Sequence, residues 1–198
     1  MSKPQTLEDL RIFYLDEYLP LYDRFVVATH VPQELHAEVA AAFDHLMRQP
    51  ISEITDTDLD RIAGHLKRAT FDSFKLIFEK EIRERYNRLM SPAYINVEDG
   101  KFQPKIQKLF DEAQKSAIAA RNAERLSSKV NVDAWNQAFD LWKKILPIAD
   151  TFQSEEVSDK IIRVTRNRRR DIIIRCVVEA LKIVLSAFAG AIVAKYFF

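Results

Sequence analysis

The last 27 residues, 172–198, constrain the fold of this chain more than any other segment, because they form an apolar run that carries a polar stripe. The longest part without a charge, residues 183–194, would rise only about 18 Å as a helix, short of the roughly 30 Å hydrocarbon layer of a bilayer. A helix that begins at Ile172 would rise about 35 Å, but it includes Arg175, Glu179 and Lys182. A membrane-spanning helix therefore requires that these three charges be accommodated.

The polar residues of this segment share one face of the predicted helix, since they follow one another at steps of three or four residues. They are Arg168, Asp171, Arg175, Glu179, Lys182 and Ser186. The opposite face is apolar from Ile173 to Ile192. This pattern indicates a helix with lipid or protein on one side and water or polar groups on the other.

The free energy of inserting one such helix into a bilayer is close to zero. Its Ile, Leu, Val and Phe side chains contribute roughly −4 to −7 kcal/mol together, whereas each deep charge costs about 2.5 to 3.5 kcal/mol. Association of several copies lowers this cost, because the charges then face one another or water. We predict a self-associating transmembrane helix, and a soluble core helix and an interfacial helix remain open alternatives. The predicted pore-lining residues are Arg175, Glu179, Lys182, Ser186 and Gly190.

A run of arginines precedes the predicted span. Within eight positions the chain has Arg163, Arg166, Arg168, Arg169 and Arg170, whereas only Lys195 follows the span. This asymmetry predicts that the N-terminal part stays in the cytoplasm. The arginines are expected to bind anionic head groups at the membrane surface. The net charge of the whole chain is only +1, so we expect no nucleic-acid partner.

The composition favours an all-α protein, because the chain has only three glycines and is rich in strong helix formers. Apolar residues at helical spacing predict helices over about 6–29, 33–48, 55–90, 105–126, 132–149 and 154–195. These form a cytoplasmic helical bundle (1–153), a basic juxtamembrane helix (154–171) and a transmembrane helix (172–198). Trp135, Phe139 and Trp142 are spaced to form a core or an oligomer face.

Three breaks in this pattern carry specific expectations. Pro20 is expected to kink or divide the first helix. The turn signal Asp99-Gly100 predicts a small hairpin-like loop within residues 91–104. Pro147 is expected in the last turn of the helix over 132–149.

The sequence has no pattern that indicates a metal or cofactor site. Its four histidines do not pair with another ligand type at a recognised spacing, and the single Cys176 offers no cluster. Glycine-rich phosphate loops are absent. The acidic group at Asp56, Asp58 and Asp60 is typical of a helix start. We expect no metal and no cofactor.

One motif has a possible enzymatic meaning. The segment Arg24-Phe-Val-Val-Ala-Thr-His30 resembles the Arg and His spacing of the HEPN ribonuclease superfamily, and residues 34–90 are similar in texture to HEPN-like helices. The resemblance implies a small helical bundle in which Arg24 and His30 would be the catalytic pair for metal-independent RNA cleavage at a dimer interface. The family usually places a polar residue after the arginine, where this chain has Phe25. The alternative is structural: Arg24 pairs with an acid and His30 ends a helix.

The sequence therefore favours an oligomeric membrane effector or pore-forming protein whose C-terminal helices line a polar path. The HEPN resemblance implies a likeness to membrane-associated accessory effectors of bacterial antiviral systems of the CRISPR type, and with it a bacterial inner membrane. The expected partners are the lipid bilayer and further copies of the chain, and a regulatory protein partner stays open. A tail-anchored scaffold that recruits a cytoplasmic partner is the second interpretation, and a soluble HEPN-like RNase is the third.

Overall fold

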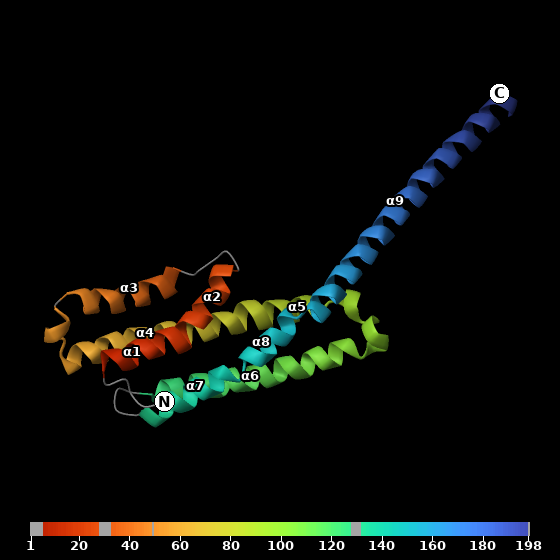
Figure 1. Cartoon of the computed structure of the whole chain (residues 1–198). Coiled ribbons are helices and arrows are strands. Elements are labelled where there is room, and N and C mark those ends of the chain that lie inside the picture. Colours follow the sequence, from red (N-terminus) through yellow and green to blue (C-terminus); the bar gives the residue numbers. More distant parts are fainter. Residues whose placement is uncertain (1–5, 28–32, 49, 128–131, 198) are drawn as a thin grey trace.

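The computed structural model describes residues 6–27, 33–48, 50–127 and 132–197, and for residues 26, 27, 34, 132, 155 and 183–197 it describes the backbone alone (Figure 1). All regular structure in these ranges is helical, and none of it is a strand. The prediction of an all-α fold is confirmed.

The N-terminal helix is continuous through Pro20. It consists of α1 (Leu7–Phe13), a π-helical turn η1 (Tyr14–Tyr18) and α2 (Leu19–Val27). Thr6 caps its start, since the Thr6 hydroxyl accepts a hydrogen bond from the Asp9 amide and the Asp9 carboxylate accepts one from the Thr6 amide. A proline lacks the amide that would bond four residues back and its ring crowds that carbonyl. The π turn ends at Tyr18, two residues before Pro20, and α2 continues through the proline, so the proline does not divide this helix.

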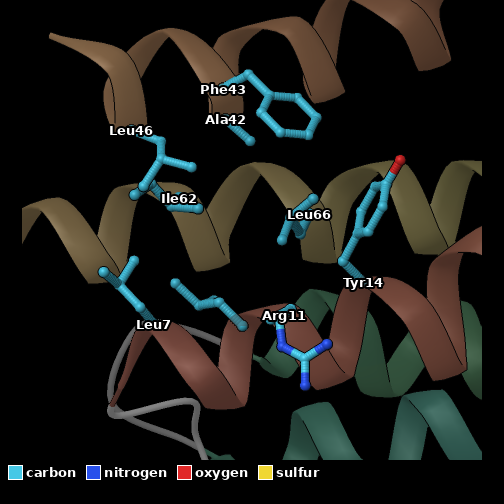
Figure 2. A pocket seen from close by; sticks show the side chains of 9 residues that line it. Leu7, Arg11, Tyr14, Ala42, Phe43, Leu46, Ile62 and Leu66 are labelled. Atoms are coloured by element: carbon cyan, nitrogen blue, oxygen red, sulfur yellow. The ribbon is translucent and has the colours of Figure 1, made fainter. Parts of the chain in front are cut away.

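The next two helices pack along each other. Helix α3 (Gln33–Met47) is joined to α4 (Asp56–Leu76) by a short 3₁₀ turn, η2 (Ile51–Glu53). Helix α4 starts with a capping box between Thr55 and Asp58, as the acidic residues there predicted. It runs on through a second π-helical segment, η3 (Ile77–Arg83), into α5 (Glu84–Leu89). Side chains from α1, α3 and α4 line a hollow at this end of the body (Figure 2).

The predicted hairpin is wrong. Residues 91–101 form two 3₁₀ turns, η4 (Pro92–Tyr94) and η5 (Val97–Gly100), and no strand. Glu98, Asp99 and Gly100 all have positive φ, at 53°, 53° and 81°. Three successive residues in the left-handed region turn the chain directly into α6 (Phe102–Leu126), which leaves no extended segment that could pair.

The helix predicted over 132–149 is two helices, so that prediction is wrong at one point. Helix α7 (Val132–Lys143) ends before a buried turn at Ile145, and α8 (Leu146–Gln153) begins there. Pro147 lies in the first turn of α8, where a missing amide breaks no helical hydrogen bond. The proline therefore marks the start of a helix here instead of an end.

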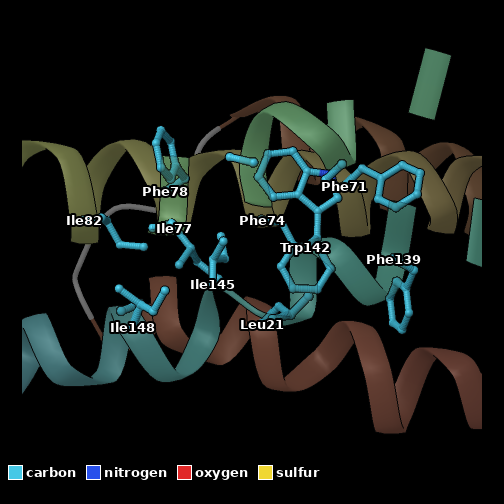
Figure 3. Packing of buried hydrophobic residues seen from close by; sticks show 14 of the residues in the cluster. Leu21, Phe71, Phe74, Ile77, Phe78, Ile82, Phe139, Trp142, Ile145 and Ile148 are labelled. Atoms are coloured by element: carbon cyan, nitrogen blue, oxygen red, sulfur yellow. The ribbon is translucent and has the colours of Figure 1, made fainter. Parts of the chain in front are cut away.

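Aromatic side chains from α4 and α7 fill the middle of the body (Figure 3). Trp142 and Phe74 are fully buried, with parallel rings whose centroids lie 6.2 Å apart. Trp135 stacks on Phe139 at 5.1 Å. Trp135, Phe139 and Trp142 were predicted to form either a core or an oligomer face, and in the structure they lie in the core.

The last helix, α9 (Glu155–Phe197), leaves the body (Figure 1). Near its start, the α9 residues Val157 and Ile161 are buried against the body, whereas every residue from 166 to 182 is exposed. We call residues 166–182 the stem. No helix in the part of the chain whose side chains are described is long and apolar enough to cross a membrane. The predicted span over 172–198 lies for the most part outside that range.

Candidate functional site

An ion-paired lysine joins the root of α9 to the body, beside the buried Val157 and Ile161. Lys160 pairs with Glu156 in the preceding turn and with Glu98 in η5, and its ammonium lies 4.9 Å from the centre of the Phe102 ring. Partial burial alone would lower the pKa of Lys160, but the hydrogen bonds to Glu156 and Glu98 raise it. Lys160 thus stays charged and holds the direction in which the stem leaves the body.

The stem has a bare apolar face. Five aliphatic residues lie on it, each between 43% and 62% exposed. They are Ile173, Ile174, Val177, Val178 and Leu181. Exposed apolar patches of this kind mark contacts with protein or membrane in soluble and peripheral proteins.

The five predicted membrane-surface arginines lie where α9 emerges. Arg163, Arg166, Arg168, Arg169 and Arg170 are all exposed. Because they occupy successive turns of one helix, they form a basic band around the base of the stem, directly before its apolar face. The basic and the apolar residues therefore follow one another along a single exposed helix.

The predicted pore-lining residues divide into two groups. Arg175, Glu179 and Lys182 are exposed on the stem, where the Lys182 ammonium lies 2.7 Å from the Glu179 carboxylate. Ser186 and Gly190 belong to the segment for which only the helical backbone is described. The single cysteine, Cys176, is also exposed on the stem.

Arg24 is held by two carboxylates. Its guanidinium donates to Glu81 at 2.7 Å and to Asp150 at 2.9 Å, so it joins α2 to η3 and α8. Burial alone would lower the pKa of Arg24, and the two carboxylates raise it. His30, its partner in the HEPN resemblance, lies outside the described residues. The contacts of Arg24 match the structural alternative, in which it pairs with an acid.

Sequence reasoning missed an aromatic groove. Tyr14, Tyr18 and Tyr22 from the N-terminal helix, with His36 and Phe43 from α3, surround a cavity of about 310 Å³. In the sequence these tyrosines are simply part of the apolar stripe that predicts the helix over about 6–29. The period of that stripe gives no sign of a hollow, because the hollow depends on where α3 docks.

No group of three or more metal-ligating side chains is placed to hold an ion in the described part of the chain. Asp58 instead belongs to the cap of α4. Comparison with protein-family models, curated proteins and solved structures finds no match to this chain.

Proposed function

We propose that this protein is an oligomeric membrane effector, in which the helical body stays on the cytoplasmic side and α9 enters the bilayer. The observation that carries the proposal is the bare apolar face of the stem, which continues in sequence into the charge-free residues 183–194. Covering five half-exposed aliphatic side chains is worth on the order of 5 kcal/mol per copy. Such a face favours a state in which lipid or another helix covers it.

The charges of the stem favour several copies over one. A single helix would carry Arg175, Glu179 and Lys182 into or near the hydrocarbon layer. In a ring of copies the same residues form stacked rings of alternating sign around a polar path, in contact with water. Ser186 and Gly190, four residues apart, allow close approach of neighbouring helices. The C-terminal helices then line the path.

The arginine band sets the orientation. Five guanidinium groups at the base of the stem are suited to the anionic surface of the cytoplasmic leaflet, each worth about 1 kcal/mol near that surface. In a bacterium this places the body at the inner face of the inner membrane. An effector role in antiviral defence is the part of the proposal that rests on the HEPN resemblance.

One observation favours a second function. The ion pair between Lys182 and Glu179 lies within one helix, so each copy neutralises two of its three deep charges by itself. This geometry would suit a tail-anchored scaffold whose helices at most dimerise and whose body recruits a cytoplasmic partner.

The experiment that separates the two is the oligomeric state in mild detergent, followed by conductance in planar bilayers. The effector should form an assembly larger than a dimer and conduct ions. Glu179→Lys should change ion selectivity or abolish assembly, whereas Val178→Ile on the apolar face is the matched control and should be nearly silent. A non-conducting monomer or dimer would favour the scaffold. Release from membranes by carbonate at high pH would contradict both.

A further inference from the structure

A single residue with a non-helical backbone joins α9 to the body. Ser154 lies between the last residue of α8, Gln153, and the first residue of α9, Glu155, and its φ and ψ are −57° and 153°. Beyond this residue α9 is one uninterrupted helix to Phe197 (Figure 1). A change in the backbone angles at Ser154 would therefore turn the whole of α9 as a rod.

Apolar contacts hold the root of α9 on the body without fixing its angle. Val157 and Ile161 lie in the first two turns of α9 and are 4% and 8% exposed. Hydrophobic contact is non-directional, so these two side chains permit α9 to rock about Ser154. The direction of the stem has to be set by a contact between particular polar atoms.

That contact is the ion pair between Lys160 on α9 and Glu98 on η5. The Lys160 side chain is 16% exposed and the Glu98 side chain is 40% exposed. Glu156, one turn earlier on α9 itself, pairs with the same ammonium at 2.6 Å. Lys160 therefore keeps a partner when Glu98 moves away, so that opening the contact with η5 leaves no buried charge uncompensated.

The η5 side of the contact is strained. Glu98 and Asp99 both have a φ of 53°, with ψ of 44° and 37°. Residues other than glycine avoid this left-handed region because the Cβ crowds the following carbonyl oxygen, and they remain in it where surrounding contacts hold them. The Lys160 ammonium is such a contact for Glu98. Release of Lys160 lets Glu98 leave the strained conformation, whereas Lys160 loses one of two partners.

We propose that η5 is a strained latch, closed while Glu98 holds Lys160 and open when η5 relaxes and α9 swings about Ser154. Lys160 lies 6 residues beyond Ser154 and Cys176 lies 22 beyond it, about 9 Å and 33 Å along the helix. A shift of about 3 Å at Lys160, enough to open the ion pair, therefore moves Cys176 by about 11 Å. In the proposed effector the latch regulates the angle at which the stem meets the membrane. This role rests on the proposed function, whereas the latch itself is a property of one chain.

The test is the distance between two spin labels, measured by double electron–electron resonance on the full chain in mild detergent. One label is on Cys176 and the other on Ile118→Cys, an exposed position of α6. Labelled chains are diluted with unlabelled chains, so the distance is read within one chain whether or not the chains assemble. The doubly labelled protein should give one narrow distribution, and Glu98→Gln should widen it or add a population displaced by up to about 10 Å. A broad distribution before the substitution, or an unchanged one after it, would overturn the proposal.

Glu156→Gln is the matched control, because it removes the other carboxylate from the same lysine and leaves Glu98 in place. Its distance distribution should stay narrow. Equal widening by Glu156→Gln and Glu98→Gln would overturn the latch, since Lys160 would then need a neutralising charge and not the contact with η5.

Asp99→Gly tests the strain in η5, because glycine adopts a positive φ without steric cost. The midpoint of thermal unfolding should rise by about 2 °C. The distance distribution should stay narrow, because Glu98 still holds Lys160. Asp99→Ala removes the same carboxylate but keeps a Cβ, so its midpoint should not rise. Equal midpoints for these two variants would overturn the proposal, because η5 would then store no strain to release.

Discussion

Arg24 and Glu81 lie 57 residues apart in the chain, yet the Arg24 guanidinium donates two hydrogen bonds to the Glu81 carboxylate. The two side chains are 25% and 13% exposed, so the pair is largely shielded from water. Asp150 contacts the same guanidinium from α8. One arginine thereby ties together three segments that are remote in sequence.

We expect Arg24→Ala to lower the free energy of unfolding by about 2 kcal/mol, because it leaves the shielded Glu81 carboxylate without its partner. The measurement is urea denaturation followed by circular dichroism. Arg48→Ala is the control, since Arg48 pairs with Asp44 four residues away and both are well exposed. Its effect should stay within about 0.5 kcal/mol. Equal losses for the two variants would mean that Arg24 is no more than a surface cation.

We also expect Arg24 and His30 together to be dispensable for RNA chemistry. Because Arg24 is hydrogen-bonded to Glu81 and Asp150, we expect the double alanine variant to keep any cellular phenotype when it accumulates to the wild-type level. Immunoblotting checks the level, and incubation of both purified proteins with single-stranded RNA checks cleavage. If wild type cleaves RNA and a folded variant does not, the HEPN-type nuclease becomes the better account.

The contact between α3 and α4 should weaken in acid through Glu38. Burial alone would raise the pKa of Glu38, but hydrogen bonds from His65 and Arg68 lower it below its ordinary 4.5. Its contribution is therefore present above about pH 4.5 and is lost as the pH falls through the folded-state pKa.

Glu38→Gln tests this expectation. The variant should be about 1 kcal/mol less stable than wild type near pH 5.5, and the difference should shrink toward about pH 3. Glu112→Gln on the exposed side of α6 is the control and should show a small difference at both pH values. A difference for Glu38→Gln that grows toward low pH would show the opposite sign of linkage.

Cys176 allows the stem to be probed without adding a cysteine, since it is the only one in the chain. An environment-sensitive fluorophore on Cys176 should shift to the blue when anionic vesicles are added, because the label leaves water. A label at Ile118→Cys in the Cys176→Ser background should not shift. Vesicles that leave the Cys176 label unchanged while the protein still floats with them would locate membrane contact elsewhere.

Tyr18→Phe should stabilise the protein. Removing a buried hydroxyl that no described residue bonds is expected to raise the free energy of unfolding by about 1 kcal/mol. Tyr86→Phe, which loses a hydrogen bond to Gln107, should instead be neutral or slightly destabilised. Thermal unfolding of the three proteins gives the comparison. Destabilisation by Tyr18→Phe would mean that its hydroxyl already has a partner.

Local signals predicted most of the helices. The cap at Thr55 and the apolar spacing from Ile62 to Ile82 place one long helix correctly, because both depend on residues near in sequence. Pro147 fits either end of a helix, so the sequence alone did not show that a helix starts there. Asp99-Gly100 has the composition of a hairpin turn, yet a strand also needs a partner, which this region does not supply.

The site was harder to predict, because its parts meet only in the folded body. Sequence reasoning found the stem, whose basic and apolar residues are consecutive. An acidic partner was one of its two interpretations of Arg24, and it did not identify Glu81 or Asp150. It also missed the aromatic groove beside Tyr14, Tyr18 and Tyr22, since the π turn over Tyr14–Tyr18 has no signature in the spacing of the residues.

Helix α9 continues from its root into the stem without interruption. The angular position of the stem's apolar face about the helix axis, relative to the body, is therefore set by the number of residues between the root and that face. Inserting one residue between Thr165 and Ile172 would turn that face by about 100° relative to the body, whereas inserting seven would return it to within about 20°. In an assembly this angle decides whether neighbouring bodies meet or are held apart. In the proposed assembly, the number of residues in this short segment therefore matters as much as their composition.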